Sequence, residues 1–219
     1  MKKIPRTAIV ILVVLLILIA DQAIKIWVKT NMSIYESIHV TSWFEIKFVE
    51  NNGMAFGLEV INKLFLTLFR LIAVGFIVYY LRKIIAAQYN RGYIVCISLI
   101  LAGAFGNIID CVFYGEIFTE SPLYNIHFAQ EPAQLVAVGE GYGTWLHGKV
   151  VDMFYFPIIN TTFPSWVPIV GGRPFEFFNA IFNLADSAIS VGIVVLLLFY
   201  RKTLTHSLHE EEKNGDSKK

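Results

Sequence analysis

The chain has 219 residues and a formal net charge of +1, and 56% of its residues are hydrophobic while only 16% are charged. The mean hydropathy is +0.59, and the hydrophobic fraction is higher than in typical soluble domains. This composition indicates an integral membrane protein. The balanced charge gives no reason to expect a nucleic-acid partner.

Four apolar segments are long enough to cross about 30 Å of hydrocarbon. They occupy residues 8–28, 64–81, 92–109 and 175–200, with outer loops at about 29–63 and 111–174. Basic residues precede the first segment, separate the second from the third, and follow the fourth. The positive-inside rule therefore places both termini in the cytoplasm and both loops outside. A cleaved signal peptide is the alternative for the first segment, which is longer than such a peptide needs.

The outer loops contain features beyond simple linkers. Residues Trp43 to Val49 alternate in polarity with the period of a β-strand, and Asn51-Asn52-Gly53 then predicts a turn. We expect an all-α membrane protein of four transmembrane helices, with a small extracytoplasmic β element and a long outer loop between spans three and four. Residues 1–202 form one membrane domain, and the charged residues 203–219 are expected to be a disordered cytoplasmic tail.

Polar residues recur at one depth in the spans. Counted from the basic cytoplasmic ends, Asp21, Asn107 and Asp186 each lie 15 or 16 residues, roughly 22–24 Å, into a helix. We expect them to converge on a pocket just beneath the outer membrane surface. Asn179 and Asn183 share one predicted helical face with Asp186. Hydrogen bonding between helices is the alternative role for the asparagines.

Charged side chains inside a membrane need partners or a function. Asp21 and Lys25, one turn apart, are expected to pair and to support the structure. Arg70 could extend toward the membrane surface or meet Asp21. Asp152 and Asp186 both lie in apolar runs where an isolated carboxylate is costly. Two carboxylates that share one proton would resolve that cost and form a general acid and base.

Five ordered motifs give the chain a family resemblance. They are Asp21-Gln22 with Lys25, Asn51 to Gly57, Gly103 to Asn107 with Asp110, Val150 to Phe154, and Phe182 to Ile189. With these motifs the chain resembles the lipoprotein signal peptidases, also called signal peptidase II, which are bacterial membrane aspartic proteases of four spans.

The resemblance implies an activity and a set of roles. Asp152 and Asp186 would be the catalytic pair that removes the signal peptide of a diacylglyceryl-modified prolipoprotein, before its lipidated cysteine. The residues implied to contact substrate or shape the site are Asn51, Gly53, Asn107, Asp110, Asn183 and Ala185. Asp21, Lys25 and Asn179 would support them. The resemblance also implies an inner-membrane monomer that contacts membrane lipid, needs no cofactor or metal, and is a target of globomycin.

Two features depart from the family. Cys111 stands where a basic residue commonly follows the aspartate, and Arg173 and Lys149 are candidates to supply that charge. Residues 113–149 are longer than the family needs. They form either a surface elaboration or a lid or partner-docking element with Gly139, Gly141 and Gly143 as hinges. A proton-coupled transporter and a non-catalytic assembly protein remain as rival functions. A transporter would require a repeat, and none is visible.

Overall fold

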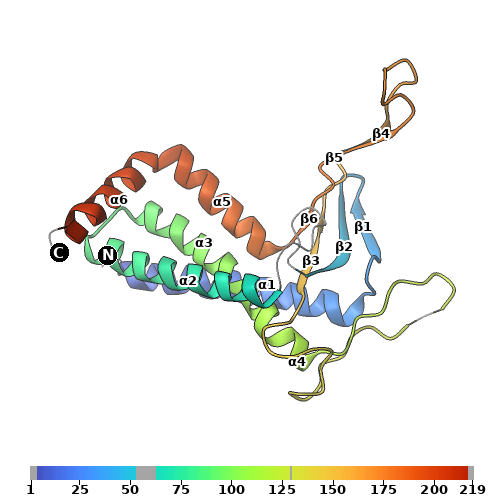
Figure 1. Ribbon diagram of the computed structural model, residues 1–219, viewed down its shortest axis with the longest axis horizontal. Helices are drawn as coiled ribbons and strands as arrows, with labels where there is room; N and C mark the ends of the chain where they lie inside the picture. The colour runs from blue at the N-terminus through green and yellow to red at the C-terminus, as the bar shows by residue number, and fades with distance from the viewer. Residues whose placement is uncertain (1–3, 53–62, 129, 217–219) are drawn as a thin grey trace.

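The computed structural model describes residues 4–52, 63–128 and 130–216. The helices form an elongated bundle with a small sheet at one end and both chain termini at the other (Figure 1). Helix α3 (Arg91–Ile109) is central, because it packs against α1 (Arg6–Asn31), α2 (Lys63–Ala86) and α5 (Leu184–Phe199). The sheet end of the bundle is where the predicted site residues lie.

Helix length and composition identify the membrane-crossing candidates. Among the described residues, three helices are long and apolar enough to cross a bilayer: α1, α2 and the continuous run Arg91–Ile117. That run consists of α3, one π-helical turn, η1 (Asp110–Tyr114), and the short helix α4 (Gly115–Ile117). A π-helical turn inside an α-helix often marks a functional site. Here it begins at Asp110, one of the predicted site residues.

The β element predicted near Trp43 is confirmed and is larger than expected. Strands β1 (Ser37–Thr41), β2 (Phe44–Asn51), β3 (Val150–Tyr155) and β6 (Ile181–Phe182) form one antiparallel sheet in that order. The pairing of β2 with β3 joins the two outer loops. Gly53, the last residue of the predicted turn, lies outside the described part of the chain.

The predicted fourth span, residues 175–200, is wrong in its first third. Strand β5 (Pro174–Phe177) and strand β6 occupy this stretch, and α5 begins only at Leu184. Hydrophobicity cannot distinguish a short apolar strand from the end of a helix. Asn183 starts the helix instead, since its side-chain oxygen accepts a hydrogen bond from the Asp186 N–H at 2.9 Å.

The predicted disordered tail is also wrong for most of its length. Residues Arg201–Asp216 form helix α6, and together with α5 its first part, to His209, would make a fourth membrane-span candidate with a bend of 87°. Packing explains the order, because Ser207 is buried and its hydroxyl lies 3.2 Å from the Tyr93 hydroxyl of α3. Composition alone could not reveal that contact.

A buried charge cluster fastens the long segment before β3 to the rest of the protein. The Lys29 ammonium is fully buried, 2.5 Å from Glu50 Oε1 on β2 and 2.8 Å from the Ser121 hydroxyl. Lys149 Nζ extends the cluster, at 3.1 Å from Glu50 Oε2 and 2.5 Å from Glu120 Oε1. The cluster joins α1, β2 and the segment 113–149 through the buried Lys29–Glu50 pair and the partly exposed pairs of Lys149.

Of the three glycines considered as hinges in this segment, Gly141 is a close packing contact, Gly143 is in ordinary van der Waals contact, and a Cβ on Gly139 would meet nothing within 4 Å. A Cβ on Gly141 would lie 2.1 Å from the Gly115 carbonyl oxygen, which also accepts a hydrogen bond from the Gly143 N–H at 2.8 Å. The Trp145 N–H donates to Glu116 Oε1 at 3.0 Å. These contacts hold the segment against α4, so its arrangement matches a fixed elaboration of the fold better than a hinged lid.

Candidate active site

Asp152 is presented by the middle of strand β3, where it lies opposite Val49 of β2. Only 3% of its surface is exposed. Its Oδ1 accepts a hydrogen bond from the Asn183 amide at 2.7 Å, and its Oδ2 accepts one from the Asn51 amide at 3.3 Å. The strand thus holds the carboxyl group inside the protein, facing the start of α5.

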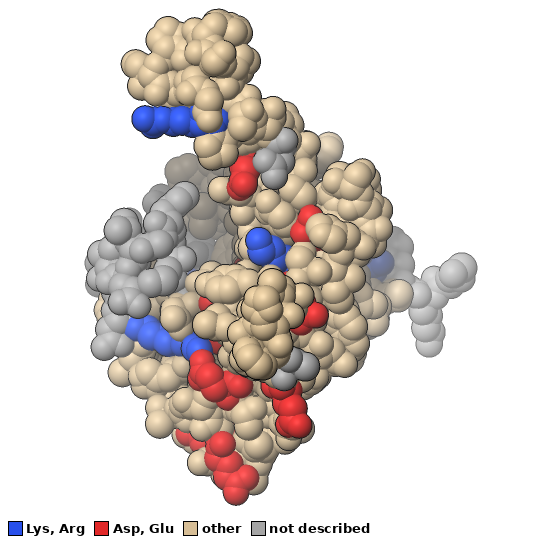
Figure 2. Space-filling model, turned by 90° about the vertical axis from the view of Figure 1, so that its right-hand side faces the viewer, with Lys and Arg blue, Asp and Glu red and all other residues tan. Residues whose placement is uncertain are grey.

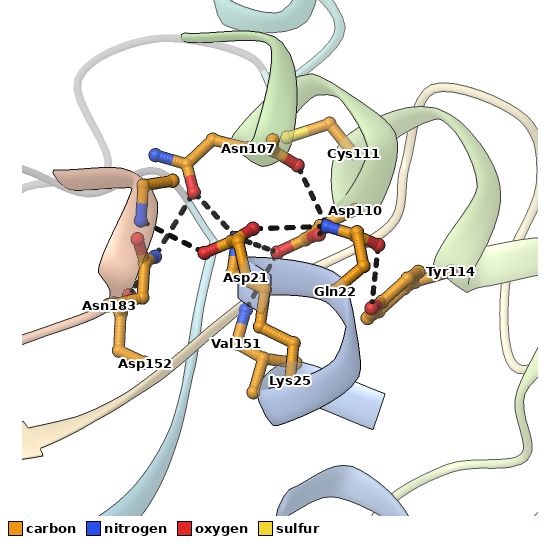
Figure 3. Close-up of polar contacts among 12 residues, drawn as sticks. Asp21, Gln22, Lys25, Asn107, Asp110, Cys111, Tyr114, Val151, Asp152 and Asn183 are labelled. Carbon is orange, nitrogen blue, oxygen red and sulfur yellow. Dashed lines mark hydrogen bonds and ion pairs between the residues drawn. The ribbon is translucent and has the colours of Figure 1, made fainter. Parts of the chain in front are cut away.

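Asp186 lies in the first turn of α5, three residues after the cap Asn183. Its Oδ1 accepts a hydrogen bond from the Asn107 amide of α3 at 2.7 Å. Asn183 Nδ2 also donates to Asn107 Oδ1 at 3.0 Å (Figure 3). Two amide groups therefore connect the two aspartates. The N-terminus of α5 and the Asn107 amide both present partial positive charge to the Asp186 side chain.

A buried lysine supports this arrangement from α1. Lys25 Nζ lies 3.0 Å from Asp21 Oδ2 and 2.8 Å from Asp110 Oδ2, and it donates to Asn107 Oδ1 at 2.9 Å. All three ammonium protons therefore have acceptors. The predicted Asp21–Lys25 pair is confirmed, and Asp110 joins it as a third member.

The two supporting carboxylates reach the backbone beside each candidate catalytic residue. Asp21 Oδ1 accepts a hydrogen bond from the Ala185 N–H at 2.9 Å, one residue before Asp186. Asp110 Oδ2 accepts one from the Val151 N–H at 3.3 Å, one residue before Asp152. The Lys25 cluster, defined as Asp21, Lys25 and Asp110, consequently fixes both the strand and the helix that carry the pair.

Sequence reasoning gave no role to two further residues in this network. Gln22 donates to Asp110 Oδ1 at 2.9 Å, and its own side-chain oxygen accepts a hydrogen bond from the Tyr114 hydroxyl at 3.0 Å (Figure 3). Gln22 directly follows Asp21 in the first motif, so its position in the sequence could have indicated a role at the site. Tyr114 is brought to the site by the π-helical turn, which the sequence does not reveal.

Two glycines allow the helices to meet at the site. A Cβ on Gly103 would lie 2.1 Å from the Ala185 carbonyl oxygen, and one on Gly106 would lie 2.8 Å from Asp21 Oδ2. Real Cβ contacts are never this short, so both positions of α3 require glycine at the observed spacing. Close approach of α3 to α1 and α5 brings Asn107 within reach of Asp186.

Burial and a neighbouring charge both change the pKa of the Asp152 carboxyl group. Burial raises the pKa of Asp152 to about 7, and repulsion from Asp186 acts in the same direction. The hydrogen bonds donated by Asn51 and Asn183 oppose this rise. A buried carboxyl that holds a proton near neutral pH beside a second carboxyl is an arrangement suited to general acid and base chemistry.

The remaining predicted residues have different fates. Asp110 and Ala185 are fully buried, whereas Gly53 lies outside the described residues. Asn179 is exposed in the loop between β5 and β6, so the prediction that it shares a helical face with Asp186 is wrong. Because the helix begins after Asn183, the assumed periodicity does not extend to Asn179.

The charge near Cys111 also differs from expectation. Arg70 of α2, rather than Arg173 or Lys149, donates a hydrogen bond to the Cys111 sulfur at 3.1 Å. Both cysteines of the chain, Cys96 and Cys111, are free and buried. Across the described residues, no group of three or more histidine, cysteine, aspartate or glutamate side chains is arranged to hold a metal ion.

Comparison with known proteins identifies the family. A family model described as signal peptidase (SPase) II matches residues 13–201. The chain belongs to the signal peptidase II family. As a member, it is a membrane-embedded peptidase of lipoprotein processing, and its family is one of aspartic proteases.

Relatives of this signal peptidase II extend over nearly its whole length. The lipoprotein signal peptidase of Porphyromonas gingivalis (strain W83) is 48% identical over 206 residues, which cover 94% of this chain and 88% of that protein. That of Amoebophilus asiaticus is 30% identical, covering 91% and 80%. A solved structure described as a bacterial membrane enzyme at 2.3 Å resolution is 26% identical, has a TM-score of 0.58, and covers 89% and 88%.

Proposed function

We propose that Asp152 and Asp186 are the catalytic pair of this signal peptidase II. The proposed reaction cleaves the peptide bond before the lipidated cysteine of a diacylglyceryl-prolipoprotein. The observation that carries the proposal is the linkage of the two carboxyl groups through Asn107 and Asn183, with one buried on a strand and the other at a helix start. Asn107 and Asn183 cannot ionise, so they take no proton from the two aspartates that they link.

The two environments assign the roles. Asp186, at the helix N-terminus, is the base that takes a proton from a water molecule as its oxygen attacks the scissile carbonyl carbon. Asp152, protonated near neutral pH, gives its proton to the carbonyl oxygen. As the resulting diol collapses, Asp152 takes back a proton from a diol hydroxyl while Asp186 gives its proton to the nitrogen, and the C–N bond breaks. The products are a signal peptide carboxylate and the free α-amino group of the lipidated cysteine.

The surrounding residues divide between contact and support. We assign Asn51, Asn107 and Asn183 to orienting the aspartates and to hydrogen bonding with the substrate backbone. Asp110 and Ala185 shape the site from inside, because both are buried and their polar groups are used by the protein. Gly53 would act in the turn above the site. No cofactor takes part in this scheme, and a globomycin-type inhibitor would compete for the same site.

We further propose that the protein is a monomer with four spans, in which α5 and the start of α6 act as the fourth. Both termini would face the cytoplasm, with the site near the outer face. Basic residues at the end opposite the sheet support this orientation, since Arg6 donates to the Tyr89 carbonyl at 2.9 Å and Arg91 donates to the Ile4 carbonyl at 2.8 Å. A substrate anchored by its lipid would then enter sideways from the membrane.

A cleavage assay with purified protein tests the assignment. A diacylglyceryl-modified prolipoprotein should lose its signal peptide with wild type, and Asp152→Asn and Asp186→Asn should each reduce the rate at least 1,000-fold. Asn179→Ala is the control for an exposed asparagine and should retain the wild-type rate. Globomycin should block cleavage. Wild-type rates in either aspartate variant would overturn the proposed pair.

A further inference from the structure

A two-stranded arm separates the two candidate catalytic residues along the chain. Strands β4 (Ile159–Thr162) and β5 pair only with each other, from Ile159 opposite Phe177 to Thr162 opposite Pro174. This arm, residues 159–177, leaves the main sheet after the strand of Asp152 and returns before the helix of Asp186. It projects sideways beyond the outline of the helices, at the sheet end of the bundle (Figure 1).

The tip of the arm is apolar and exposed. Trp166 and Ile169 have 80% and 90% of their surface exposed, among the highest values for large apolar residues in the described chain. The stretch from Tyr155 to Gly172 contains no charged residue, and Arg173 follows it directly. Viewed from the sheet end, the projecting lobe has no acidic side chain and carries one basic side chain at its neck (Figure 2).

Backbone polar groups of the tip form hydrogen bonds with one another. The Val167 N–H donates to the Pro164 carbonyl at 3.0 Å, and the Gly171 N–H donates to the Val167 carbonyl at 2.9 Å. The Phe163 N–H and Arg173 carbonyl close the tip with a bond of 2.9 Å. A loop whose polar backbone groups bond internally loses little when it moves into an apolar environment.

Ile169 occupies a backbone conformation that a β-branched residue rarely adopts. Its φ is +72°, in the left-handed region where glycine or asparagine is favoured. The turn therefore carries strain while it directs a large apolar side chain outward, where it contacts little of the protein. Strained residues of this kind persist where the side chain has a function.

We propose that the tip of the arm inserts into the interfacial region of the outer membrane leaflet. Tryptophan favours that region, and Arg173 at the neck would meet the lipid phosphates. The bilayer is the occupant that fits best, because the membrane-spanning helices already place this end of the bundle beside it. This proposal rests on the membrane orientation proposed above.

Insertion would have a consequence for the site. The arm connects Asp152 to Asp186, so a tip held by lipid fixes the connection between them relative to the membrane surface. A substrate whose cysteine carries two acyl chains is held at that same surface. The arm would therefore act on the capture of membrane-borne substrate, with no direct contribution to the chemistry.

Fluorescence of Trp166 tests the location directly. Wild type and Trp166→Phe would be reconstituted in nanodiscs of phosphatidylcholine and phosphatidylglycerol, with or without brominated acyl chains. The difference spectrum isolates Trp166 from the other three tryptophans. We expect a blue-shifted emission that brominated lipid quenches at least two-fold. Emission typical of water without quenching would overturn the proposal, as would shielding from aqueous iodide without quenching by lipid, which would indicate a protein partner.

Cleavage kinetics test the consequence and separate the two proposals. Trp166→Asp with Ile169→Asp should raise the KM for substrate in vesicles at least five-fold, while kcat in detergent micelles stays unchanged. Trp166→Leu with Ile169→Leu is the matched apolar control and should resemble wild type. An unaltered KM in the aspartate variant would contradict the role in capture. If the enzyme is active but Trp166 is not quenched, membrane insertion of the arm is refuted and the proposed function stands. If wild type is inactive, the proposed function is refuted.

Discussion

Replacement of Asp152 by asparagine should stabilise the protein while it abolishes cleavage. The pKa of Asp152 rises from 3.8 to about 7 on folding, chiefly because the carboxyl group is buried. Between these values the native state holds a proton that the unfolded state has released, so the free energy of unfolding falls as pH rises. At about 1.36 kcal/mol per pKa unit, the loss by pH 8 approaches about 4 kcal/mol.

An amide at position 152 cannot ionise, so the variant avoids this loss. It also keeps an oxygen for the hydrogen bond that Asn183 donates, while the longer bond from Asn51 is sacrificed at a cost of about 1 kcal/mol. We therefore expect Asp152→Asn to be more stable than wild type at pH 8, by up to about 3 kcal/mol, and close to wild type at pH 4.

Thermal unfolding in detergent micelles at pH 4, 6 and 8 measures this difference. The melting temperature of wild type should fall with pH relative to that of Asp152→Asn, and the gap should open between pH 4 and 7. Glu131→Gln, which changes an exposed carboxylate, is the control and should follow wild type. A variant that is less stable than wild type at pH 8 would refute the inference that Asp152 is held in a costly environment.

Three further outcomes follow from the same site. The kcat/KM of wild type should decline about tenfold per pH unit above about pH 7, as Asp152 loses its proton; a profile that stays flat to pH 9 would exclude it as the acid. Lys25→Met should lower stability by about 3–5 kcal/mol and abolish cleavage, because two buried carboxylates lose their partner, and a near-normal melting temperature would contradict this. Gly103→Ala should cost about 1–3 kcal/mol and slow cleavage, whereas Gly75→Ala, with open space around its Cα, should do neither.

Much of the site could be predicted because helices turn sequence distance into depth. Counting residues from the basic ends placed Asp21, Asn107 and Asp186 at one level, and the structure brings them together through Lys25, Asn107 and the Ala185 N–H. The helical count failed only where the helix ended. Asn179 lies before the helix cap, exposed in the loop between β5 and β6, so the helical spacing does not apply there.

Other features depended on contacts that no local pattern encodes. The order in α6 comes from Ser207 meeting Tyr93 more than 100 residues away in sequence. The contact of Arg70 with Cys111 joins two helices whose rotation relative to each other cannot be derived from their composition. Asp152 was singled out because it lies in an apolar run, and its strand pairing with Val49 became visible only in the structure.

The charge cluster around Lys29 limits how this protein can be shortened. Deleting residues 123–142 would remove the Tyr142 ring, which lies 4.9 Å from the Lys29 ammonium and 5.0 Å from that of Lys149. It would also open Glu50 to water, one strand away from Asp152. Loss of turnover in such a truncated enzyme would result from disruption of this charge cluster. A shortened protein would therefore need Lys29, Glu50 and Lys149 to be redesigned together.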